Sequence, residues 1–269
     1  MKRLIICFDG TWNNPQQEEN GVTSPTNVYR LKNSISATAN NSKVIQKVFY
    51  HPGVGGKEIG FIDELLGGAL GLGINRHISS AYHWLGLNYR EGDEVFLFGF
   101  SRGAFSARSL AGFLGSGLLD LNKISAKESW QRVDIAFNSG YKNKLPQNSW
   151  AKNHWQFYQD KGPIPITFLG VWDTVGALGI PDDLEIINSL DRKETWQFHD
   201  TKLAVHIKHA RHAMAMDEKR TSFTVTRWSN VVDHRDAVEL WFPGVHSDHR
   251  VWTGWPCPDF PGSAHKKRG

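Results

Sequence analysis

The sequence predicts one α/β domain built on a mostly parallel sheet. Continuous apolar runs such as Leu4–Phe8 and Ile166–Trp172 are typical of strands that a parallel sheet buries on both faces. Segments in which apolar residues recur with helical spacing alternate with these runs along the chain. Polar residues follow directly after several of the runs. We therefore expect helices on both faces of the sheet and chemically active side chains at the ends of its strands.

The elements are expected in a regular order along the chain. Strands are predicted at Leu4–Phe8, Val44–Tyr50, Val95–Phe98, Ile166–Trp172, Phe223–Thr226 and Val238–Phe242, and helices at Val28–Ile35, Ile74–Asn88, Ala104–Leu114 and Leu203–Met216. A mostly polar stretch between about 120 and 162 predicts helices inserted over the sheet. Residues 1–248 then form one domain, and Trp, Pro and Gly dominate an irregular, divergent or truncated tail at 249–269.

Composition excludes several classes of protein. A length of 269 residues suits one domain with a large core, and a net charge of +4 without a basic stripe is too small to argue for nucleic acid. The two cysteines, Cys7 and Cys257, do not make a disulfide framework. The apolar run before Asp9 is too short for the core of a signal peptide, and no run approaches the roughly 20 residues of a membrane-spanning helix. We expect a cytoplasmic protein, with any export by a route that reads no N-terminal signal.

The segment Gly99-Phe100-Ser101-Arg102-Gly103 is the most informative part of the chain. An apolar strand leads into it and a helical pattern follows, which is the form of a nucleophile elbow. The flanking glycines fit such a turn because a Cβ two residues either side of the serine would clash. The plainer alternative is that Ser101 is an ordinary N-cap. The elbow predicts a serine hydrolase, in which the inserted helices take the position where hydrolases often carry a lid.

A serine nucleophile needs a base to accept its proton and a carboxylate to orient that base. Chain order in hydrolases with this elbow is serine, acid, histidine. Asp173 stands at the carboxyl end of one predicted strand and His246 just past the last one, so both fit. The alternatives are that Asp173 caps a turn through Thr174 and that His246 is one ordinary histidine of twelve. We predict catalysis by Ser101, Asp173 and His246, with no metal and no organic cofactor.

The oxyanion hole is expected to combine two backbone N–H groups. One is the N–H of Arg102, at the start of the helix after Ser101. The second is the N–H of Gly10 or Thr11, in the loop after the first strand, although Asp9-Gly10-Thr11 also reads as a simple polar turn.

Three other motifs are weaker. Gly55-Gly56-Lys57 lacks the remaining residues of a phosphate-binding loop, and Gly71-Leu72-Gly73 lacks the third glycine of a dinucleotide fingerprint. His206, His209 and His212 share helical spacing, but no glutamate accompanies them as in a zinc protease. We expect these histidines to line a partly polar helix face.

Six segments in order carry a resemblance to a known family. They are Phe8–Asn13, Tyr50–Gly55, Gly99–Ala104, Gly170–Gly176, His212–Glu218 and Trp241–Asp248. Together they resemble the α/β-hydrolase family typified by the catalytic domain of type VI secretion phospholipase effectors, over residues 1 to about 248. The resemblance implies an α/β-hydrolase-like fold and an esterase or phospholipase with Ser101 as nucleophile and His246 as base. Asp173 is the favoured acid, and Asp217 and Asp248 are the fallback acids.

The resemblance also implies partners. The substrate would be a phospholipid or other ester, met in transient contact with a membrane surface, and no nucleic acid is involved. Effectors of this type are injected into rival cells without a signal peptide, so a secretion-machinery or immunity partner is implied.

Two alternatives stay open. A strand-ending Asp9 followed by Gly-Thr is superficially similar to haloacid-dehalogenase-like phosphatases, although Thr11 stands where they carry a second aspartate. The other alternative is a catalytically impaired, partner-binding domain on the hydrolase scaffold. It arises because His249–Trp255 replaces the valine and glycine run that usually follows His-Ser-Asp in the family.

Overall fold

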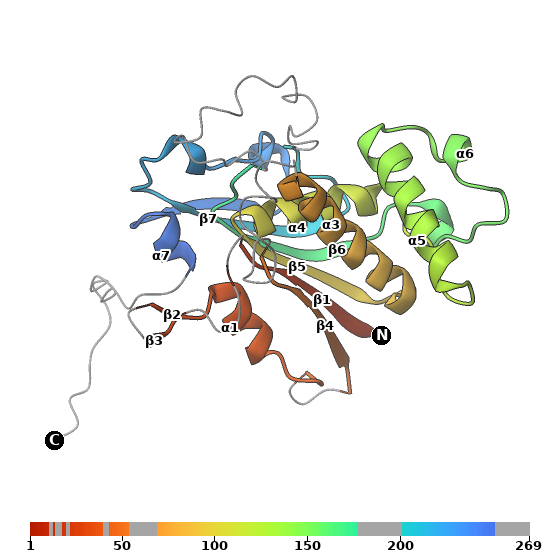
Figure 1. The fold of residues 1–269 in the computed structure, drawn as a ribbon, viewed down its shortest axis with the longest axis horizontal. Coiled ribbons are helices and arrows are strands. Elements are labelled where there is room, and N and C mark those ends of the chain that lie inside the picture. The colour runs from red at the N-terminus through yellow and green to blue at the C-terminus, as the bar shows by residue number, and fades with distance from the viewer. Residues whose placement is uncertain are drawn as a thin grey trace.

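A computed structural model of the chain describes residues 1–10, 13, 18–19, 22–39, 43–53, 69–176 and 201–250. Its centre is a six-stranded sheet in the order β4-β1-β5-β6-β7-β8, in which every neighbouring pair is parallel (Figure 1). The strands are β1 (Lys2–Phe8), β4 (Ile45–His51), β5 (Glu94–Phe100), β6 (Ile166–Trp172), β7 (Ile207–Ala215) and β8 (Ala237–Phe242). A separate two-stranded ribbon pairs β2 (Glu18–Glu19) with β3 (Val22–Thr23). The fold is α/β-hydrolase-like, as predicted.

Helices cover both faces of the sheet (Figure 1). On one face, α3 (Ala69–Asn88) and α4 (Arg102–Gly115) pack in a large core with Leu4, Ile6 and Phe8 of β1. On the other face, α1 (Asn27–Ser34) contributes Val28 to a smaller core with Ile5 and Cys7. Successive residues of β1 point to opposite faces, so its continuous apolar run serves both cores. The prediction of helices on both faces is confirmed.

The order of the strands creates a switch point between β1 and β5. From β1 the chain adds β4 on one side and then returns to place β5 on the other side. In open parallel sheets, ligands and reacting groups gather outside the carboxyl ends of the strands at such a point. The carboxyl ends of β1 and β5 lead to Asp9 and Ser101 respectively.

Most of the predicted elements are confirmed. The structure has α1, α3 and α4 where helices are expected, and β1, β4, β5, β6 and β8 where strands are expected. Local chemistry explains one of these helix starts. The hydroxyl of Thr26 accepts a hydrogen bond from the N–H of Tyr29 (3.0 Å) and so caps α1.

The helix predicted at Leu203–Met216 is wrong, because this segment supplies β7. Strand β7 pairs with β6 on one side and β8 on the other. Ala210, His212 and Met214 are all buried, at every second position, which is the period of a strand. His209 and His212 lie three positions apart and so point to opposite faces, which overturns the expectation of one histidine-bearing helix face.

The short strand predicted at Phe223–Thr226 is also wrong. Thr221–Phe223 forms a single 3-10 turn, and Val225 makes only an isolated bridge with Val175. A second 3-10 turn at Val231–Asp233 precedes β8. The aromatic and β-branched residues of Phe223–Thr226 favour a strand, but the segment does not join the six-stranded sheet.

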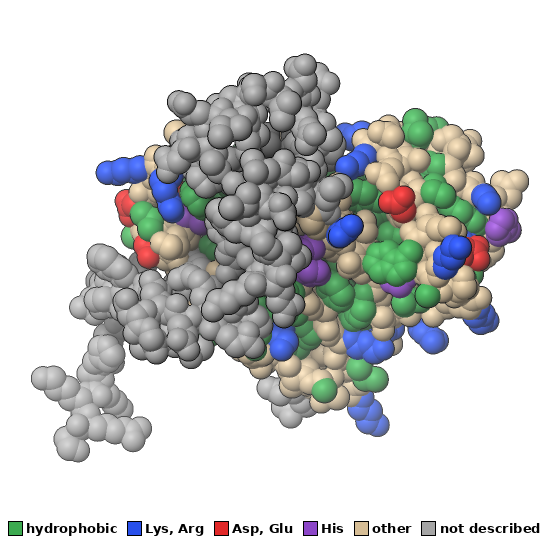
Figure 2. Space-filling view, in the orientation of Figure 1, with side chains coloured by type: hydrophobic (Ala, Val, Ile, Leu, Met, Phe, Trp, Pro, Cys, Tyr) green, Lys and Arg blue, Asp and Glu red, His purple; other side chains and the backbone are tan. Residues whose placement is uncertain are grey.

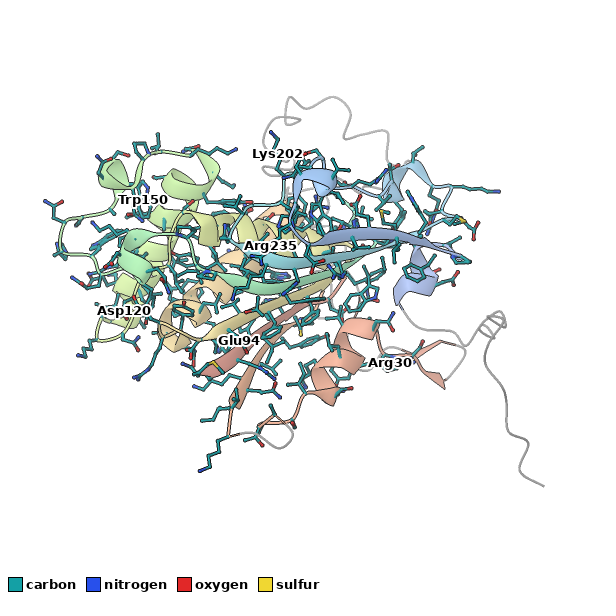
Figure 3. All side chains as sticks on the ribbon, turned by 180° about the vertical axis from the view of Figure 1, so that it is seen from behind. Arg30, Glu94, Asp120, Trp150, Lys202 and Arg235 are labelled. Carbon is teal, nitrogen blue, oxygen red and sulfur yellow. The ribbon has the colours of Figure 1, made fainter. Side chains whose placement is uncertain are left out.

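The predicted insertion is helical, but it lies far from Ser101. It consists of α5 (Ala126–Ile135), the π-helix η1 (Ala136–Lys142), α6 (Gln147–Trp150) and the 3-10 turn η2 (Gln159–Lys161). Helix α5 packs on α3, η1 packs on α4, and α6 packs on η1. They lie at the opposite end of the molecule from α7 (His246–Arg250) (Figure 1). Seen from behind, Asp120 and Trp150 lie at one end and Arg30 of α1 towards the other (Figure 3). The insertion is therefore helical and follows α4, as predicted.

Lys and Arg side chains are scattered over the visible face rather than gathered in a stripe (Figure 2). Among the described residues, no helix combines the length and the apolar character needed to cross a membrane. The predicted tail lies outside the described residues from 251 onward, as does Cys257, while His249 and Arg250 end α7.

Candidate active site

Ser101 lies in a sharp turn between β5 and α4. Its backbone has φ 57° and ψ −123°, a combination that costs a residue other than glycine about 1–3 kcal/mol. The N–H of Ser101 donates to the carbonyl of Trp172 (3.0 Å), and its own carbonyl accepts from the N–H of Phe105 (3.2 Å). Its hydroxyl makes no capping hydrogen bond to α4. The surroundings therefore hold a strained turn whose side chain is not used as an N-cap.

The glycines on either side of Ser101 are required by this turn. A Cβ on Gly99 would lie 2.4 Å from the carbonyl oxygen of Gly103. One on Gly103 would lie 2.3 Å from the carbonyl oxygen of Phe8. Both obstacles are backbone atoms, which cannot swing aside as a flexible side chain can. The prediction that side chains would clash at these two positions is confirmed.

The imidazole of His246 lies between Ser101 and Asp173. Its Nε2 is 2.8 Å from Ser101 Oγ, and its Nδ1 is 2.5 Å from Asp173 Oδ2. All three residues are buried, with 5%, 6% and 1% of Ser101, His246 and Asp173 exposed. These contacts fit the tautomer in which Nδ1 donates to the carboxylate and Nε2 accepts from the hydroxyl. The three side chains singled out from the sequence are thus brought together, from positions up to 145 residues apart.

The ends of β6 and β7 aim the carboxylate of Asp173. This residue directly follows β6 with φ 40°, a left-handed conformation that non-glycine residues rarely adopt. Its N–H donates to the carbonyl of Ala213 (2.7 Å), and its Oδ1 accepts from the N–H of Ala215 (2.9 Å). One carboxylate oxygen is thus held by β7 and the other is turned towards His246.

A carboxylate that the sequence did not single out holds the backbone of His246. Glu218 Oε2 accepts from the N–H of His246 (3.2 Å). Arg220 donates to Glu218 through Nε (2.9 Å) and Nη2 (2.6 Å), and these bonds, with backbone N–H donors, lower the pKa of Glu218 to about 2. Glu218 does end the segment His212–Glu218 that carries the resemblance. Its position, just after the strand-forming residues of β7, is the feature of the sequence from which a role at the site could have been inferred.

Two aromatic rings fix the plane of the imidazole. The ring of His246 stacks on Phe100, with 4.8 Å between centroids and 25° between planes. Phe223 packs against it at 4.8 Å and 50°. The sequence places Phe100 beside Ser101 but gives no sign that Phe223 reaches the site.

A buried histidine and glutamate support the segment that carries Asp173. Nε2 of His212 accepts from the N–H of Thr174 (3.2 Å), and its Nδ1 lies 3.0 Å from Glu239 Oε1. Burial lowers the pKa of His212, consistent with a neutral ring. Burial alone would raise the pKa of Glu239, but hydrogen bonds from His212, the N–H of Trp228 and Arg227 outweigh it and lower the pKa to about 2. This network joins β7 and β8 beneath the site.

The other two histidines of the sequence pattern lie elsewhere. His206 Nε2 is 3.0 Å from the carbonyl of Ala111, and His209 Nδ1 is 2.5 Å from Asp236. Among the described residues, no group of three or more His, Cys, Asp or Glu side chains is arranged to hold a metal ion.

The two fallback acids have other contacts. Asp217 Oδ2 accepts from the N–H of Gly244 (2.7 Å), while its own N–H donates back to the carbonyl of Gly244 (3.0 Å). Asp248 Oδ2 accepts from the N–H of Val245 (2.9 Å) at the start of α7. Both carboxylates thus shape the loop that leads to His246, and the carboxylate that contacts the imidazole is that of Asp173.

The backbone N–H groups expected to form the oxyanion hole differ in position and in hydrogen bonding. Arg102 is the first residue of α4, directly after Ser101. The N–H of Gly10 donates to Asp9 Oδ1 (2.9 Å), so it is committed to that carboxylate. A Cβ on Gly10 would lie 2.7 Å from the ring of Phe100, which shows how closely this loop approaches the turn. Thr11 lies outside the described residues.

Asp9 ties three segments together. Its Oδ2 accepts from the hydroxyls of Thr26 (2.6 Å) and Tyr50 (2.9 Å), while Oδ1 accepts from Gly10. Burial and the neighbouring Asp9 charge raise the pKa of Tyr50, and they raise that of the buried Cys7 thiol to about 12. Both oxygens of Asp9 are engaged in joining β1, β4 and the cap of α1, which argues against its use as a phosphatase nucleophile.

Comparisons with known proteins identify the family of the chain. A family model described as type VI secretion system phospholipase effector Tle1-like, catalytic domain, matches residues 2–258. The uncharacterized protein YEL023C of Saccharomyces cerevisiae (strain ATCC 204508 / S288c) is 30% identical over 239 residues, which cover 82% of this chain and 32% of that protein. This chain therefore spans about a third of the length of that relative.

Two solved structures are also similar. An uncharacterized protein from Pseudomonas aeruginosa has a TM-score of 0.49 and 19% identity, over 92% of this chain and 41% of that one. The NocB thioesterase domain, in covalent complex with a fluorophosphonate nocardicin G analog, has a TM-score of 0.38 and 11% identity, over 92% and 86% of the two chains. The family match runs from the first strand of the sheet to beyond His246. The chain therefore belongs to the Tle1-like phospholipase effector catalytic-domain family of lipase- or esterase-like hydrolases.

Proposed function

We propose that this chain is a serine hydrolase that cleaves a carboxylic ester, namely an acyl ester of a phospholipid or related lipid. The single observation that carries the proposal is the line of contacts from Ser101 Oγ through His246 to Asp173, at 2.8 and 2.5 Å. A serine hydroxyl is a weak nucleophile until a base accepts its proton, and this geometry supplies the base and its orienting acid. Family membership supports lipid as the substrate.

The reaction follows from the roles of these side chains. Ser101 Oγ attacks the acyl carbonyl carbon while Nε2 of His246 takes the hydroxyl proton, and Asp173 stabilises the imidazolium that forms. The tetrahedral oxyanion collapses, His246 protonates the departing alcohol oxygen, and the acyl group stays on Ser101. Water then attacks the acyl-enzyme with His246 as base, which releases the carboxylic acid and restores the serine.

The turn at Ser101 supplies the oxyanion donor in this proposal. The N–H of Arg102 opens α4, where backbone N–H groups and the helix dipole favour negative charge. The second donor would be Thr11 or Gly10, and Gly10 serves only if its N–H leaves Asp9. No metal or organic cofactor is required. A secretion-machinery or immunity partner is proposed from the family alone.

Ser101→Ala tests the proposal most directly. We expect kcat/KM on a short-chain nitrophenyl ester and on phospholipid vesicles to fall by roughly three orders of magnitude or more. Labelling by a fluorophosphonate probe should be lost as well. Ser106→Ala is the matched control, because Ser106 is a buried serine one turn further along α4 whose hydroxyl bonds the carbonyl of Arg102. Full turnover by Ser101→Ala would refute the mechanism, and turnover of soluble esters without phospholipid would refute the lipid substrate alone.

A further inference from the structure

Arg220 is a cation that two contacts fix beside the imidazole of His246. In the first contact, its guanidinium carbon lies over the ring of Phe223, 4.1 Å from the ring centroid. Phe223 packs in turn against the imidazole, with 4.8 Å between centroids. A guanidinium that stacks on an aromatic face is attracted to it and restrained in its plane. One aromatic ring thus separates this cation from the base of the proposed triad.

The second contact of Arg220 is the carboxylate of Glu218. Arg220 donates to it through Nε (2.9 Å) and Nη2 (2.6 Å), and Glu218 Oε2 also accepts from the N–H of His246 (3.2 Å). Glu218, Arg220 and Phe223 therefore form a closed circuit of contacts with His246. Because the guanidinium is held along one edge and on one face, its opposite edge points in a fixed direction.

The opposite edge of this guanidinium is accessible from solvent. The side chain of Arg220 is 55% exposed. Within the part of the chain that the structure describes, its hydrogen bonds are those of Nε and Nη2 to Glu218, and Nη1 makes none. Arginine carries five N–H donors in a planar fork, which matches the oxygens of a phosphate group. The outer edge can therefore donate to an anionic group that approaches the site.

The ion pair with Glu218 leaves this donor capacity in place. Glu218 also accepts from the backbone N–H groups of Lys219 (2.9 Å) and Arg220 (2.8 Å), so several donors share its negative charge. The neighbouring Asp217 accepts from the N–H of Gly244 (2.7 Å) and is matched by the exposed cation of Lys219. An anion at the outer edge of the guanidinium would thus meet donors rather than an uncompensated carboxylate.

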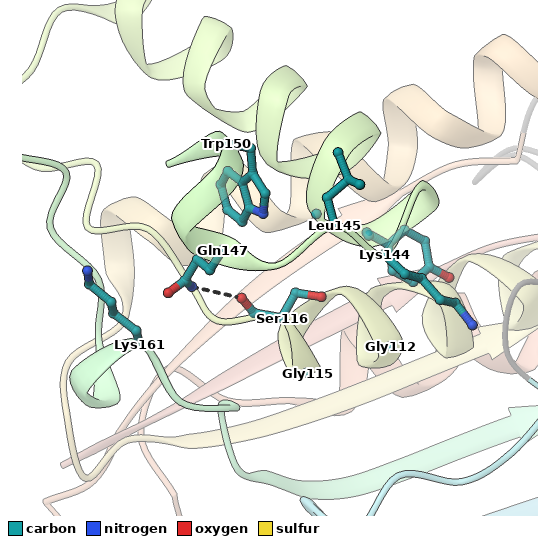
Figure 4. A pocket seen from close by; sticks show the side chains of 10 residues that line it. Gly112, Gly115, Ser116, Lys144, Leu145, Gln147, Trp150 and Lys161 are labelled. Carbon is teal, nitrogen blue, oxygen red and sulfur yellow. Dashed lines mark hydrogen bonds between the residues drawn. The ribbon is translucent and has the colours of Figure 1, made fainter. Parts of the chain in front are cut away.

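The cavity shown in Figure 4 lies too far from Ser101 to play this part. Its volume is about 320 Å³, and it lies between the last turn of α4 and α6. At 1.5 Å per residue, the 14 residues of α4 separate it from the turn at Ser101 by about 20 Å. A charged group that is attached close to the reacting ester cannot reach so far, whereas Arg220 lies beside His246.

We propose that Arg220 binds the phosphate of a phospholipid substrate and so selects phospholipids over neutral lipid esters. This inference rests on the proposed function. In that reaction His246 protonates the departing alcohol oxygen, and in a glycerophospholipid only a short chain of bonds joins that oxygen to the phosphate. The outer edge of the guanidinium donates to the phosphate oxygens, while Phe223 and Glu218 hold it in place. Arg220 then sets specificity and takes no part in the transfer of the acyl group.

The test compares two lipids that differ in the phosphate. Phosphatidylcholine and diacylglycerol with the same acyl chains are presented in micelles of an uncharged detergent, so that neither surface carries a net charge. Arg220→Gln should lower the ratio of kcat/KM for phosphatidylcholine to kcat/KM for diacylglycerol by roughly tenfold, as expected when a hydrogen bond to a charged group is lost. Any displacement of His246 lowers both values and cancels in the ratio.

Two further variants separate this contact from other effects of charge. Arg220→Lys keeps the positive charge but loses the planar fork, so the ratio should fall less than in Arg220→Gln. Lys219→Gln removes the exposed neighbouring cation and should leave the ratio unchanged. An unchanged ratio in Arg220→Gln, with both lipids still cleaved, would overturn this inference and leave the proposed function intact. Cleavage of neither lipid by the wild type would overturn both.

Discussion

Asp173 uses its two carboxylate oxygens for two purposes. Oδ1 is fixed by the backbone of β7, and Oδ2 accepts from Nδ1 of His246. In Asp173→Asn, the amide can be placed with its NH₂ towards the imidazole, which favours the tautomer with its proton on Nε2. That tautomer cannot accept from Ser101, so kcat/KM for ester hydrolysis should fall by roughly three to four orders of magnitude. Steady-state kinetics with circular dichroism as a check of folding would measure this.

The fallback acids provide matched controls for that measurement. Asp217→Asn and Asp248→Asn remove charges that contact Gly244 and Val245, just before His246, but leave the contact between Asp173 and the imidazole in place. Each should lose less than about tenfold in kcat/KM, because each can still accept a backbone N–H through its amide oxygen. If either variant loses as much as Asp173→Asn, the assignment of the acid is wrong.

Glu218 is expected to act through His246, as a positioning residue. Glu218→Ala removes the acceptor of the His246 N–H and frees Arg220, so the imidazole should be displaced. We expect kcat to fall by between about tenfold and a hundredfold with KM little changed, as small misplacements of reacting groups cause. Glu218→Gln keeps an acceptor oxygen and should recover part of the loss. Equal activity of both variants and the wild type would show that Glu218 only shapes the surface.

At the scale of whole elements, strands were predicted correctly where a continuous apolar run is covered on both faces of the sheet. The strand predicted at Ile166–Trp172 has the observed bounds, because both faces of β6 need apolar side chains. It failed at β7, where Ala210, Ala213 and Met214 also fit a helical period. Only the neighbours β6 and β8, which are distant in sequence, decide that this segment is extended. The buried pair of His212 and Glu239 was missed for the same reason.

The contact between β7 and β8 predicts a pH-dependent stability. The pKa of Glu239 is lowered from 4.5 to about 2 in the folded chain, so its carboxylate stabilises the fold above pH 4.5. That contribution is lost as the pH falls from 4.5 towards 2. The free energy of unfolding of Glu239→Gln should be lower than that of the wild type at pH 7 by about 1–2 kcal/mol, with allowance for solvent screening.

Denaturant unfolding at several pH values would measure this difference. The gap between the two proteins should narrow as the pH approaches 2, because the wild-type carboxylate then becomes neutral. Glu94→Gln is the control, since Glu94 makes a partly exposed ion pair with Arg3 (2.9 Å) that contributes little. A gap that stays constant from pH 7 to pH 2 would mean that the charge of Glu239 is not what stabilises the contact.

For the molecule as a whole, the strongest prediction was that the candidate site residues gather at the carboxyl edge of the sheet. A parallel sheet brings residues that end different strands to one edge, so Ser101, Asp173 and His246 could be placed together without any knowledge of their contacts. The engagement of the Gly10 N–H by Asp9 could not be predicted, because it depends on which way one side chain turns. The position of the insertion was also hidden, because a polar helical segment does not reveal the end of α4 on which it packs.

The position of the helical insertion predicts how the protein responds when Ser101 is occupied. If the insertion is not a cover for Ser101, covalent capture of Ser101 by a fluorophosphonate should slow hydrogen exchange near the site and leave the insertion unchanged. We expect protection at residues 172–175 and 243–248, which flank Asp173 and His246, and no change at 126–150, some 20 Å away at the other end of α4. Mass-spectrometric exchange would compare labelled protein with Ser101→Ala treated with the same probe. Protection concentrated at 126–150 would instead show that the insertion closes over the site when it is occupied.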